Sequence, residues 1–86
     1  MNSESRSDWF VYMVQCSDES LYTGITTDIE RRLSRHNQGV GSRYTRSRRP
    51  VELVYTETAT DRSEALRREL QIKRLPVVAK RALISG

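Results

Sequence analysis

"WFVYMVQCSDESLYTGIT", residues 9–26, decides the fold, because it contains two strand-like runs separated by a turn. Residues 9–16 are aromatic and β-branched and are apolar on both faces, which is typical of a central or well-covered strand. Residues 17–20 are polar and turn-forming, and residues 21–26 return as a second strand. The stretch therefore predicts an antiparallel β-hairpin.

The register of this hairpin decides whether Tyr12 and Tyr22 share a face of the sheet. Side chains alternate along a strand, and directly opposed residues share a face. A two-residue loop at Asp18 and Glu19 would pair even positions with odd ones and place the two phenols on opposite faces, whereas a loop of odd length, or one bulge, would place them on the same face. The sequence contains no Asn-Gly or Asp-Gly to force the short loop. Both registers are therefore open, and a site shared by the two tyrosines requires the odd one.

The first helix follows the hairpin directly. Thr27 and Glu30 have the spacing of a capping box, and Gly39 stands where a left-handed residue would end the helix. Because each helical residue advances by about 100°, Arg32 and His36 border the stripe that faces the core, while Arg31 and Arg35 point away from it. Arg32 could be an arginine that snorkels at the edge of the core, and His36 a hydrogen-bonded boundary histidine. Of the three arginines, helical geometry nevertheless places only Arg32 at the border of the core.

The second half of the chain predicts a third strand and two helices. "VELVYTET", residues 51–58, alternates with Val51, Leu53 and Tyr55 on one face. Residues 62–75 form the second helix, and residues 76–85, which begin with a proline, form a short last helix. The order of elements is β-β-α-β-α-α, in one domain over residues 9–86. Residues 1–8 lack a hydrophobic pattern, and we expect them to be a flexible N-terminus.

Glu69 is unusual within the second of these helices. It falls in the middle of the apolar stripe that Ala65 and Ile72 define, whereas Glu64, which with Asp61 repeats the capping-box spacing, faces water. A carboxylate beside a core is costly unless it is paired or binds a metal. An ion pair with the residue four positions on, Lys73, is one explanation, and a metal site is the other.

The composition sets the class of protein and favours an anionic partner. The 86 residues, 36% of them hydrophobic, can bury a single modest core. Cys16 is the only cysteine, which excludes an internal disulfide and fits a cytoplasmic protein, and no apolar run is long enough to span a membrane. The formal charge is +4, from thirteen arginines and two lysines against eleven acidic residues. Arginine suits bidentate phosphate contacts, so this balance indicates nucleic acid.

Residues 39–50, "GVGSRYTRSRRP", concentrate this basic charge. They carry no acidic residue and are expected to form a mobile or short-helical loop; an ordinary solvated turn is the alternative. Its candidate DNA-binding side chains are Arg43, Tyr44, Arg46, Arg48 and Arg49.

Taken in order, several of these features resemble the GIY-YIG nuclease family. The residues that carry the resemblance are Tyr12 in "VYMV", Tyr22 and Gly24 in "YTG", Arg32 and His36 in "RLSRH", and Glu69 in "ALRRE". The match spans residues 9 to about 75 and is most similar to the small stand-alone, YhbQ-like bacterial members. The chain departs from the family pattern in two places. The first glycine of the motif is replaced, since Phe10 and Val11 precede Tyr12, and no asparagine follows Asn37.

The resemblance implies a three-stranded antiparallel sheet flanked by helices, and a metal-dependent enzyme that cleaves DNA phosphodiester bonds, in repair or recombination. Glu69 would bind Mg²⁺ or Mn²⁺, Tyr12 would activate or orient the attacking water, and Tyr22 would position water or phosphate. Arg32 would hold the scissile phosphate, His36 would assist proton transfer or bind phosphate, and Gly24 would permit close approach. DNA is the expected partner, with RNA as an open alternative and no obligate protein partner; Arg35 and the basic loop would grip the DNA. A nucleic-acid-binding module with little or no catalysis is the alternative function.

Overall fold

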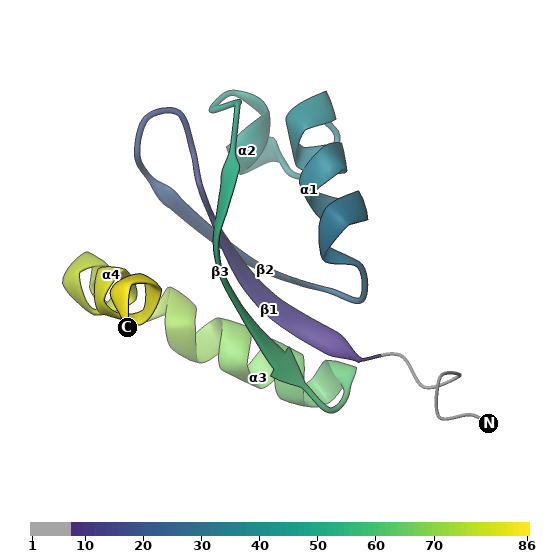
Figure 1. Cartoon of the computed structure of the whole chain (residues 1–86), viewed down its shortest axis with the longest axis vertical. Helices are drawn as coiled ribbons and strands as arrows, with labels where there is room; N and C mark the ends of the chain where they lie inside the picture. Colours follow the sequence, from purple (N-terminus) through teal and green to yellow (C-terminus); the bar gives the residue numbers. More distant parts are fainter. Residues whose placement is uncertain (1–7) are drawn as a thin grey trace.

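The strand β1 (Trp9–Gln15) lies at the centre of the sheet, with β2 (Leu21–Thr26) on one side and β3 (Glu52–Ala59) on the other. Both pairings are antiparallel in the computed structural model, which describes residues 8–86 (Figure 1). The predicted flexible segment, residues 1–8, lies outside the described residues except for its last position. The α+β class, the three-stranded antiparallel sheet and the central position of the first strand are confirmed.

The hairpin has the odd register. Tyr12 pairs with Gly24, and Val14 pairs with Tyr22, so even positions face even positions and both phenols lie on one face. The backbone N–H of Cys16 donates to the carbonyl of Ser20, and the loop between them contains three residues. Its third residue, Glu19, has φ 71°, which is the left-handed conformation that this class of loop requires.

A β-bulge in β3 overturns one prediction about the third strand. Met13 pairs with Tyr55, but the next residue of β1, Val14, pairs with Leu53, so Val54 is an extra residue on β3. Leu53 therefore packs on the face of Tyr12, whereas Tyr55 packs on the opposite face. The prediction that Leu53 and Tyr55 share a face was wrong, because strict alternation does not hold across a bulge.

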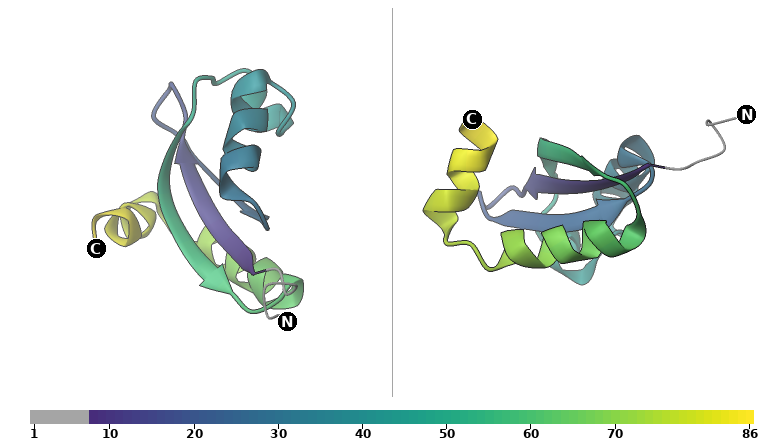
Figure 2. Two further views of the ribbon diagram at one scale, coloured as in Figure 1. Left: turned by 45° about the vertical axis from the view of Figure 1, so that its right-hand side comes forward. Right: turned by 90° about the horizontal axis from the view of Figure 1, so that it is seen from below.

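Helices cover both faces of the sheet. The helices α1 (Ile29–Gln38) and α2 (Arg43–Arg46) lie on one side, and α3 (Arg62–Lys73) and α4 (Val77–Ser85) lie on the other (Figures 1 and 2). Each side has its own apolar cluster. Ile29 and Leu33 of α1 pack against Tyr12 and Val14 on the first side, while Ala65 and Ile72 of α3 pack against the opposite face of β1. Within residues 8–86, no helix is long and apolar enough to cross a membrane.

The helix termini confirm one sequence signal and correct another. Gly39 has φ 88° and ends α1 through bonds from its N–H to the Arg35 and His36 carbonyls, as predicted. The N-cap of α1 is Asp28, whose carboxylate accepts from the N–H of Arg31 at 3.1 Å. The predicted capping box that begins at Thr27 was therefore wrong, because the adjacent aspartate provides the better acceptor and starts the helix one residue later.

The basic loop is short-helical, which adds one element to the predicted order. Ser42 caps α2 by accepting a hydrogen bond from the N–H of Thr45 at 3.1 Å.

The last helix, α4, is fixed to the hairpin, because the Arg81 guanidinium donates to the Gln15 side chain at 2.6 Å and to the Glu19 carbonyl at 2.7 Å. The chain beyond β3 thus braces the loop whose register places the two tyrosines together.

We expect Glu19→Gly to raise the free energy of unfolding by about 1 kcal/mol. A left-handed conformation is strained for a residue with a Cβ and not for glycine, and the Glu19 carbonyl that accepts from Arg81 is kept. Urea unfolding measures the change. Ser17→Gly, an exposed substitution in the same loop without a positive φ, is the control and should give no gain; equal effects of the two changes would contradict the interpretation.

Candidate active site

The centre of the candidate site is the Tyr12 hydroxyl, which is held by two side chains of α1. His36 Nε2 lies 2.8 Å from it, and Arg32 Nε donates to it at 3.3 Å. Tyr12 is 2% exposed and His36 is fully buried. The two residues that helical geometry placed at the border of the core, Arg32 and His36, therefore meet on the same phenol.

Gly24, two residues after Tyr22, leaves the space that the Tyr12 phenol occupies. Tyr12 and Gly24 are direct partners in the hairpin, and a Cβ added to Gly24 would lie 2.6 Å from the Tyr12 hydroxyl oxygen. The Tyr12 ring therefore lies across Gly24, at a separation that no other residue would allow. The spacing from Tyr22 to Gly24 follows from this contact together with the two-residue alternation of the strand.

Tyr22 joins the same cluster from β2. Its ring packs edge-on against the His36 ring at 5.3 Å between centroids, and it stacks with Tyr44 of α2 at 6.0 Å. The Lys73 ammonium of α3 lies 6.0 Å from the Tyr22 ring centroid. Tyr22 thus connects the α1 and α2 side of the site to α3.

Arg32 is held so that part of its guanidinium remains available. Its Nη2 donates to the Gly41 carbonyl at 2.9 Å, in addition to the bond from Nε to Tyr12. Arg31 and Arg35 are exposed, as predicted, and with Arg32 they line a hollow at the start of α1. An anion that enters this hollow meets three arginines from one helix.

Burial keeps the phenol and the imidazole neutral. Burial, assisted by the Arg32 charge, lowers the pKa of His36 from 6.5 to about 4. Burial also raises the pKa of Tyr12 above 10, and this effect exceeds the opposite effect of the hydrogen bond and charge of Arg32. Arg32 alone therefore does not create a phenolate. Because the His36 ring has no exposed surface, direct phosphate binding is not available to it, whereas proton transfer through Tyr12 is.

Glu69 reaches the site from α3. Its place beside the site follows from Lys73, with which it pairs and whose ammonium lies 6.0 Å from the Tyr22 ring centroid. Its negative charge also makes a small contribution to the raised pKa of Tyr12. The side chain is 17% exposed and forms an ion pair with Lys73 at 3.3 Å, which is the pairing that the sequence left open beside a metal site. Glu64 is exposed, as predicted.

The donor set can be compared with the needs of a divalent cation. Among residues 8–86, no three His, Cys, Asp or Glu side chains gather into a metal-binding group. Mg²⁺ commonly uses one or two carboxylates, substrate phosphate and water, so the partly exposed Glu69 carboxylate fits this ion with a phosphate substrate. It does not fit zinc, which needs three or four protein ligands.

Two of the four arginines of the basic loop stabilise the loop itself. Arg48 forms an ion pair with Asp18 at 3.0 Å, and its guanidinium carbon lies 3.9 Å from the Tyr44 ring centroid. Arg49 donates to the Arg46 carbonyl at 2.9 Å and to the Asn37 carbonyl at 3.4 Å. The sequence did not indicate these contacts. Tyr44, a candidate DNA-binding residue from the sequence, has its ring packed against Tyr22 and Arg48.

Thr45 is a member of the cluster that sequence reasoning missed. It is fully buried, and its hydroxyl lies 2.8 Å from His36 Nδ1, on the side of the imidazole opposite Tyr12. The only available signal was the periodicity of a four-residue helix, which is too short to show which residue faces inward. The buried cluster is therefore Tyr12, His36 and Thr45, with Arg32 and Tyr22 at its border.

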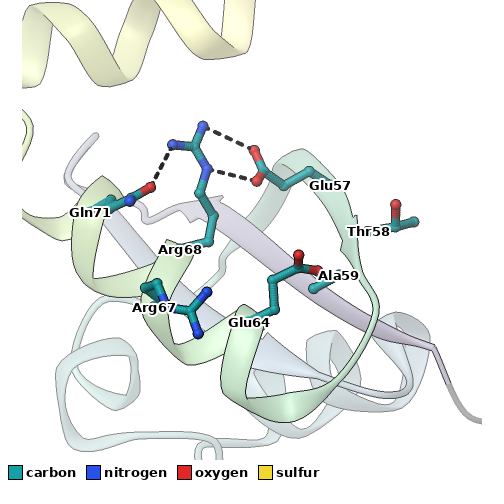
Figure 3. A pocket seen from close by; sticks show the side chains of 7 residues that line it. All are labelled: Glu57, Thr58, Ala59, Glu64, Arg67, Arg68 and Gln71. Carbon is teal, nitrogen blue, oxygen red and sulfur yellow. Dashed lines mark hydrogen bonds and ion pairs between the residues drawn. The ribbon is translucent and has the colours of Figure 1, made fainter.

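A separate hollow lies between β3 and α3 (Figure 3). Arg68 Nε and Nη2 donate to the two carboxylate oxygens of Glu57 at 2.7 and 3.3 Å, and Nη1 donates to Gln71 at 3.2 Å. The Tyr55 hydroxyl also donates to Glu57. These charged groups satisfy one another and do not include the tyrosine cluster, so we interpret them as a brace between helix and strand.

Comparison with known proteins gives a family match over most of the chain. The family described as the GIY-YIG catalytic domain matches residues 8–76. The UPF0213 protein DP2720 of Desulfotalea psychrophila is 61% identical over 82 residues, which cover 94% of this chain and 74% of the relative. The UPF0213 protein NP_0776A of Natronomonas pharaonis is 48% identical over 79 residues, covering 92% and 93%.

A solved structure agrees with the fold. The solution NMR structure of the UPF0213 protein BH0048 from Bacillus halodurans superposes with a TM-score of 0.58 at 42% identity, over 91% of this chain and 83% of that chain. The chain is therefore similar to a group of small proteins of the same architecture, and the similarity includes the segment that carries the tyrosine cluster.

The stability of the protein should fall as the pH is lowered from about 7 towards 4. The unfolded chain protonates His36 near pH 6.5, whereas the folded chain does so near pH 4, so the contribution is complete above 6.5 and is lost across this interval. The difference between the pKa values of His36 in the unfolded and folded chain corresponds to about 3 kcal/mol of free energy of unfolding. Urea unfolding between pH 7.5 and 4.5 measures it, with His36→Gln as the control that lacks the titration. Parallel pH curves for the two proteins would contradict the buried neutral histidine.

Proposed function

Because this chain belongs to the GIY-YIG catalytic domain family, a nuclease family, we propose that it is a divalent-metal-dependent nuclease that hydrolyses DNA phosphodiester bonds. The observation that carries the proposal is the Tyr12 hydroxyl held between Arg32 and His36, with Glu69 beside the site. A neutral phenol, a neutral imidazole, a cation and a carboxylate are the groups that phosphoryl transfer needs at one place.

Arg32 is proposed to bind the scissile phosphate. Two of its five N–H donors are used by Tyr12 and by the Gly41 carbonyl, and these bonds fix the plane of the guanidinium. The remaining donors can contact phosphate oxygens, and the charge stabilises the negative charge that builds up in the transition state. The hollow beside it, with Arg31 and Arg35, leaves room for the phosphate to approach.

Tyr12 and His36 are proposed to remove the proton of the attacking water. The water passes a proton to the Tyr12 oxygen while the Tyr12 hydroxyl proton moves to His36 Nε2, 2.8 Å away. The resulting hydroxide oxygen forms the new bond to phosphorus, and the leaving oxygen departs and takes a proton from solvent. His36 is neutral at rest, because burial lowers its pKa, and its Nε2 can therefore accept the proton transiently. Tyr22, packed against His36, is proposed to position the water or the phosphate.

Glu69 is proposed to hold the metal, Mg²⁺ or Mn²⁺. When bound, the cation supplies Lewis-acid stabilisation of negative charge on the phosphate and the leaving oxygen. The Glu69 carboxylate pairs with the Lys73 ammonium at 3.3 Å. This pair also favours the second candidate function, a nucleic-acid-binding module of the same fold with little catalysis, in which Glu69 would serve only to orient Lys73.

The DNA backbone is proposed to contact the exposed arginines on the α1 and α2 side. Arg35, Arg43 and Arg46 are exposed, whereas Arg48 and Arg49 are committed to the loop. Phosphate contacts fix position and carry little base information, so we expect selectivity for DNA structure over sequence, as a repair or recombination enzyme would need. A cytoplasmic location fits Cys16, a buried free thiol.

The nuclease assignment predicts a pattern of activity among four variants. On plasmid, branched and single-stranded DNA with Mg²⁺ or Mn²⁺, Glu69→Gln and Arg32→Lys should each lower the cleavage rate by about 100-fold or more, because each removes charge stabilisation or its geometry. Glu52→Gln and Arg62→Lys are matched controls at exposed positions outside the hollow and should cleave at the rate of the unmodified protein.

Two outcomes would overturn parts of this assignment. Binding without cleavage on every substrate would identify the binding module, and RNA in the same assay tests the alternative nucleic acid. Cleavage that survives Glu69→Gln would remove the metal ligand from this position.

Binding should separate the arginines of α2 from those that stabilise the loop. Arg43→Ala and Arg46→Ala should each reduce the slope of log K against log salt on duplex DNA by about 0.9, the value for one lost phosphate contact. Arg48→Ala should instead lower the melting temperature, because it removes the pair with Asp18. Arg62→Ala, at the start of α3, is the exposed control, since that end of α3 lies away from α2 (Figure 1). An unchanged slope in both α2 variants would exclude this surface.

A further inference from the structure

Thr45 is a buried polar residue to which the function above gives no role. Its hydroxyl oxygen lies 2.8 Å from His36 Nδ1 and 2.9 Å from Ser42 Oγ, and the side chain is fully buried. The partner of one imidazole nitrogen determines which nitrogen carries the proton. Thr45 is therefore placed to determine whether His36 Nε2, the nitrogen that faces Tyr12, carries the proton.

With the proton on Nδ1, the polar hydrogens on the Tyr12, His36 and Thr45 side chains all have acceptors. Nδ1–H donates to the Thr45 hydroxyl oxygen, and the Thr45 hydroxyl donates to Ser42, either to Oγ or to the carbonyl at 3.4 Å. The unprotonated Nε2 then accepts from the Tyr12 hydroxyl. Arg32 Nε–H occupies a lone pair of the Tyr12 oxygen and favours this direction, because the phenol hydrogen must point elsewhere.

With the proton on Nε2, one buried hydrogen is left over. The Tyr12 oxygen would receive hydrogen bonds from both His36 and Arg32, and within the described residues 8–86 its own hydrogen would have no protein acceptor. Tyr12 is 2% exposed, and an unsatisfied buried donor is costly. The hydrogen-bond count therefore selects the Nδ1–H tautomer.

We propose that Thr45 is a positioning residue that keeps the His36 proton on Nδ1 and so leaves Nε2 as the acceptor for the Tyr12 proton. The proposal rests on the nuclease function above, since the accepted proton is the one that Tyr12 passes on from the attacking water. Thr45 touches neither substrate nor metal in this role. It acts through His36, and its own hydroxyl is oriented by the Ser42 residue that caps α2.

The state of His36 can be measured without any nuclease activity. His36 is the only histidine of the chain, so its two ring nitrogens give unambiguous ¹⁵N signals in an NMR spectrum at pH 7. The expected spectrum has a protonated Nδ1 and an unprotonated Nε2 in the unmodified protein. A protonated Nε2 would overturn the proposal, whatever the protein does to DNA.

Two substitutions of Thr45 separate the hydroxyl from the shape of the side chain. Thr45→Val keeps the volume but cannot accept from Nδ1, so the protonated fraction should move to Nε2. Thr45→Ser keeps the hydroxyl and should retain the Nδ1–H signal. Thr58→Val makes the same chemical change on β3, beside the hollow of Figure 3, and is the control.

The kinetic consequence has a form that a loss of packing would not produce. Thr45→Val should lower kcat by about 10- to 100-fold with KM nearly unchanged, and Thr45→Ser should restore most of the rate. Equal kcat for the valine variant and the unmodified protein would overturn the proposal. If no variant, including the unmodified protein, cleaves DNA, the nuclease function fails while the NMR spectrum still decides the tautomer; if Thr45→Val does not fold, the unmodified protein and the serine variant still decide it.

Discussion

The hydrogen bond between the Tyr12 hydroxyl and His36 Nε2 joins the centre of the sheet to α1, and the rest of the site depends on it. A buried phenol and a buried imidazole must each find partners, so the strand, the helix and the short helix that follows are constrained together. Gly24 opposite Tyr12 provides the space, and Thr45 provides the second partner of His36. The polar groups therefore specify one arrangement of elements whose apolar contacts alone would tolerate others.

One face of the sheet buries a purely apolar cluster, and the other face carries the buried polar side chains of the candidate site. On the α3 side, Val11 and Met13 of β1 pack against Ala65 and Ile72 in a purely apolar cluster. On the α1 side, the cluster around Val14 is interrupted by the polar network. In a chain of 86 residues the core is small, so the apolar face must carry much of the hydrophobic stabilisation, while the other face tolerates buried polar groups because they are fully paired.

Much of the fold and part of the site could be predicted from the sequence, for reasons that are local. The 100° step of a helix distinguishes Arg32 from its exposed neighbours, and a glycine that follows a helical pattern marks its end. The hairpin register could only be left open, since its loop places Glu19, and not a glycine, in the left-handed region. The face of Tyr55 was predicted wrongly because the bulge at Val54 has no counterpart in the alternation of residues. Thr45 could not be identified, because its importance lies in a contact across nine residues of chain.

The basic loop shows why a count of positive charges overstates the number of side chains that are free to meet an anion. Each arginine raises the net charge equally, but a guanidinium that donates to loop carbonyls or pairs with Asp18 is held in place by the loop and is less free to turn towards a phosphate. Arg48 and Arg49 fix α2 against the hairpin and α1, and this fixed position is what allows Arg43 and Arg46 to face solvent while Thr45, on the same four-residue helix, faces His36. The loop arginines therefore have two different roles. One pair, Arg48 and Arg49, supports the helix that carries the partner of the imidazole, and the other pair, Arg43 and Arg46, presents positive charge to solvent at a fixed distance from it.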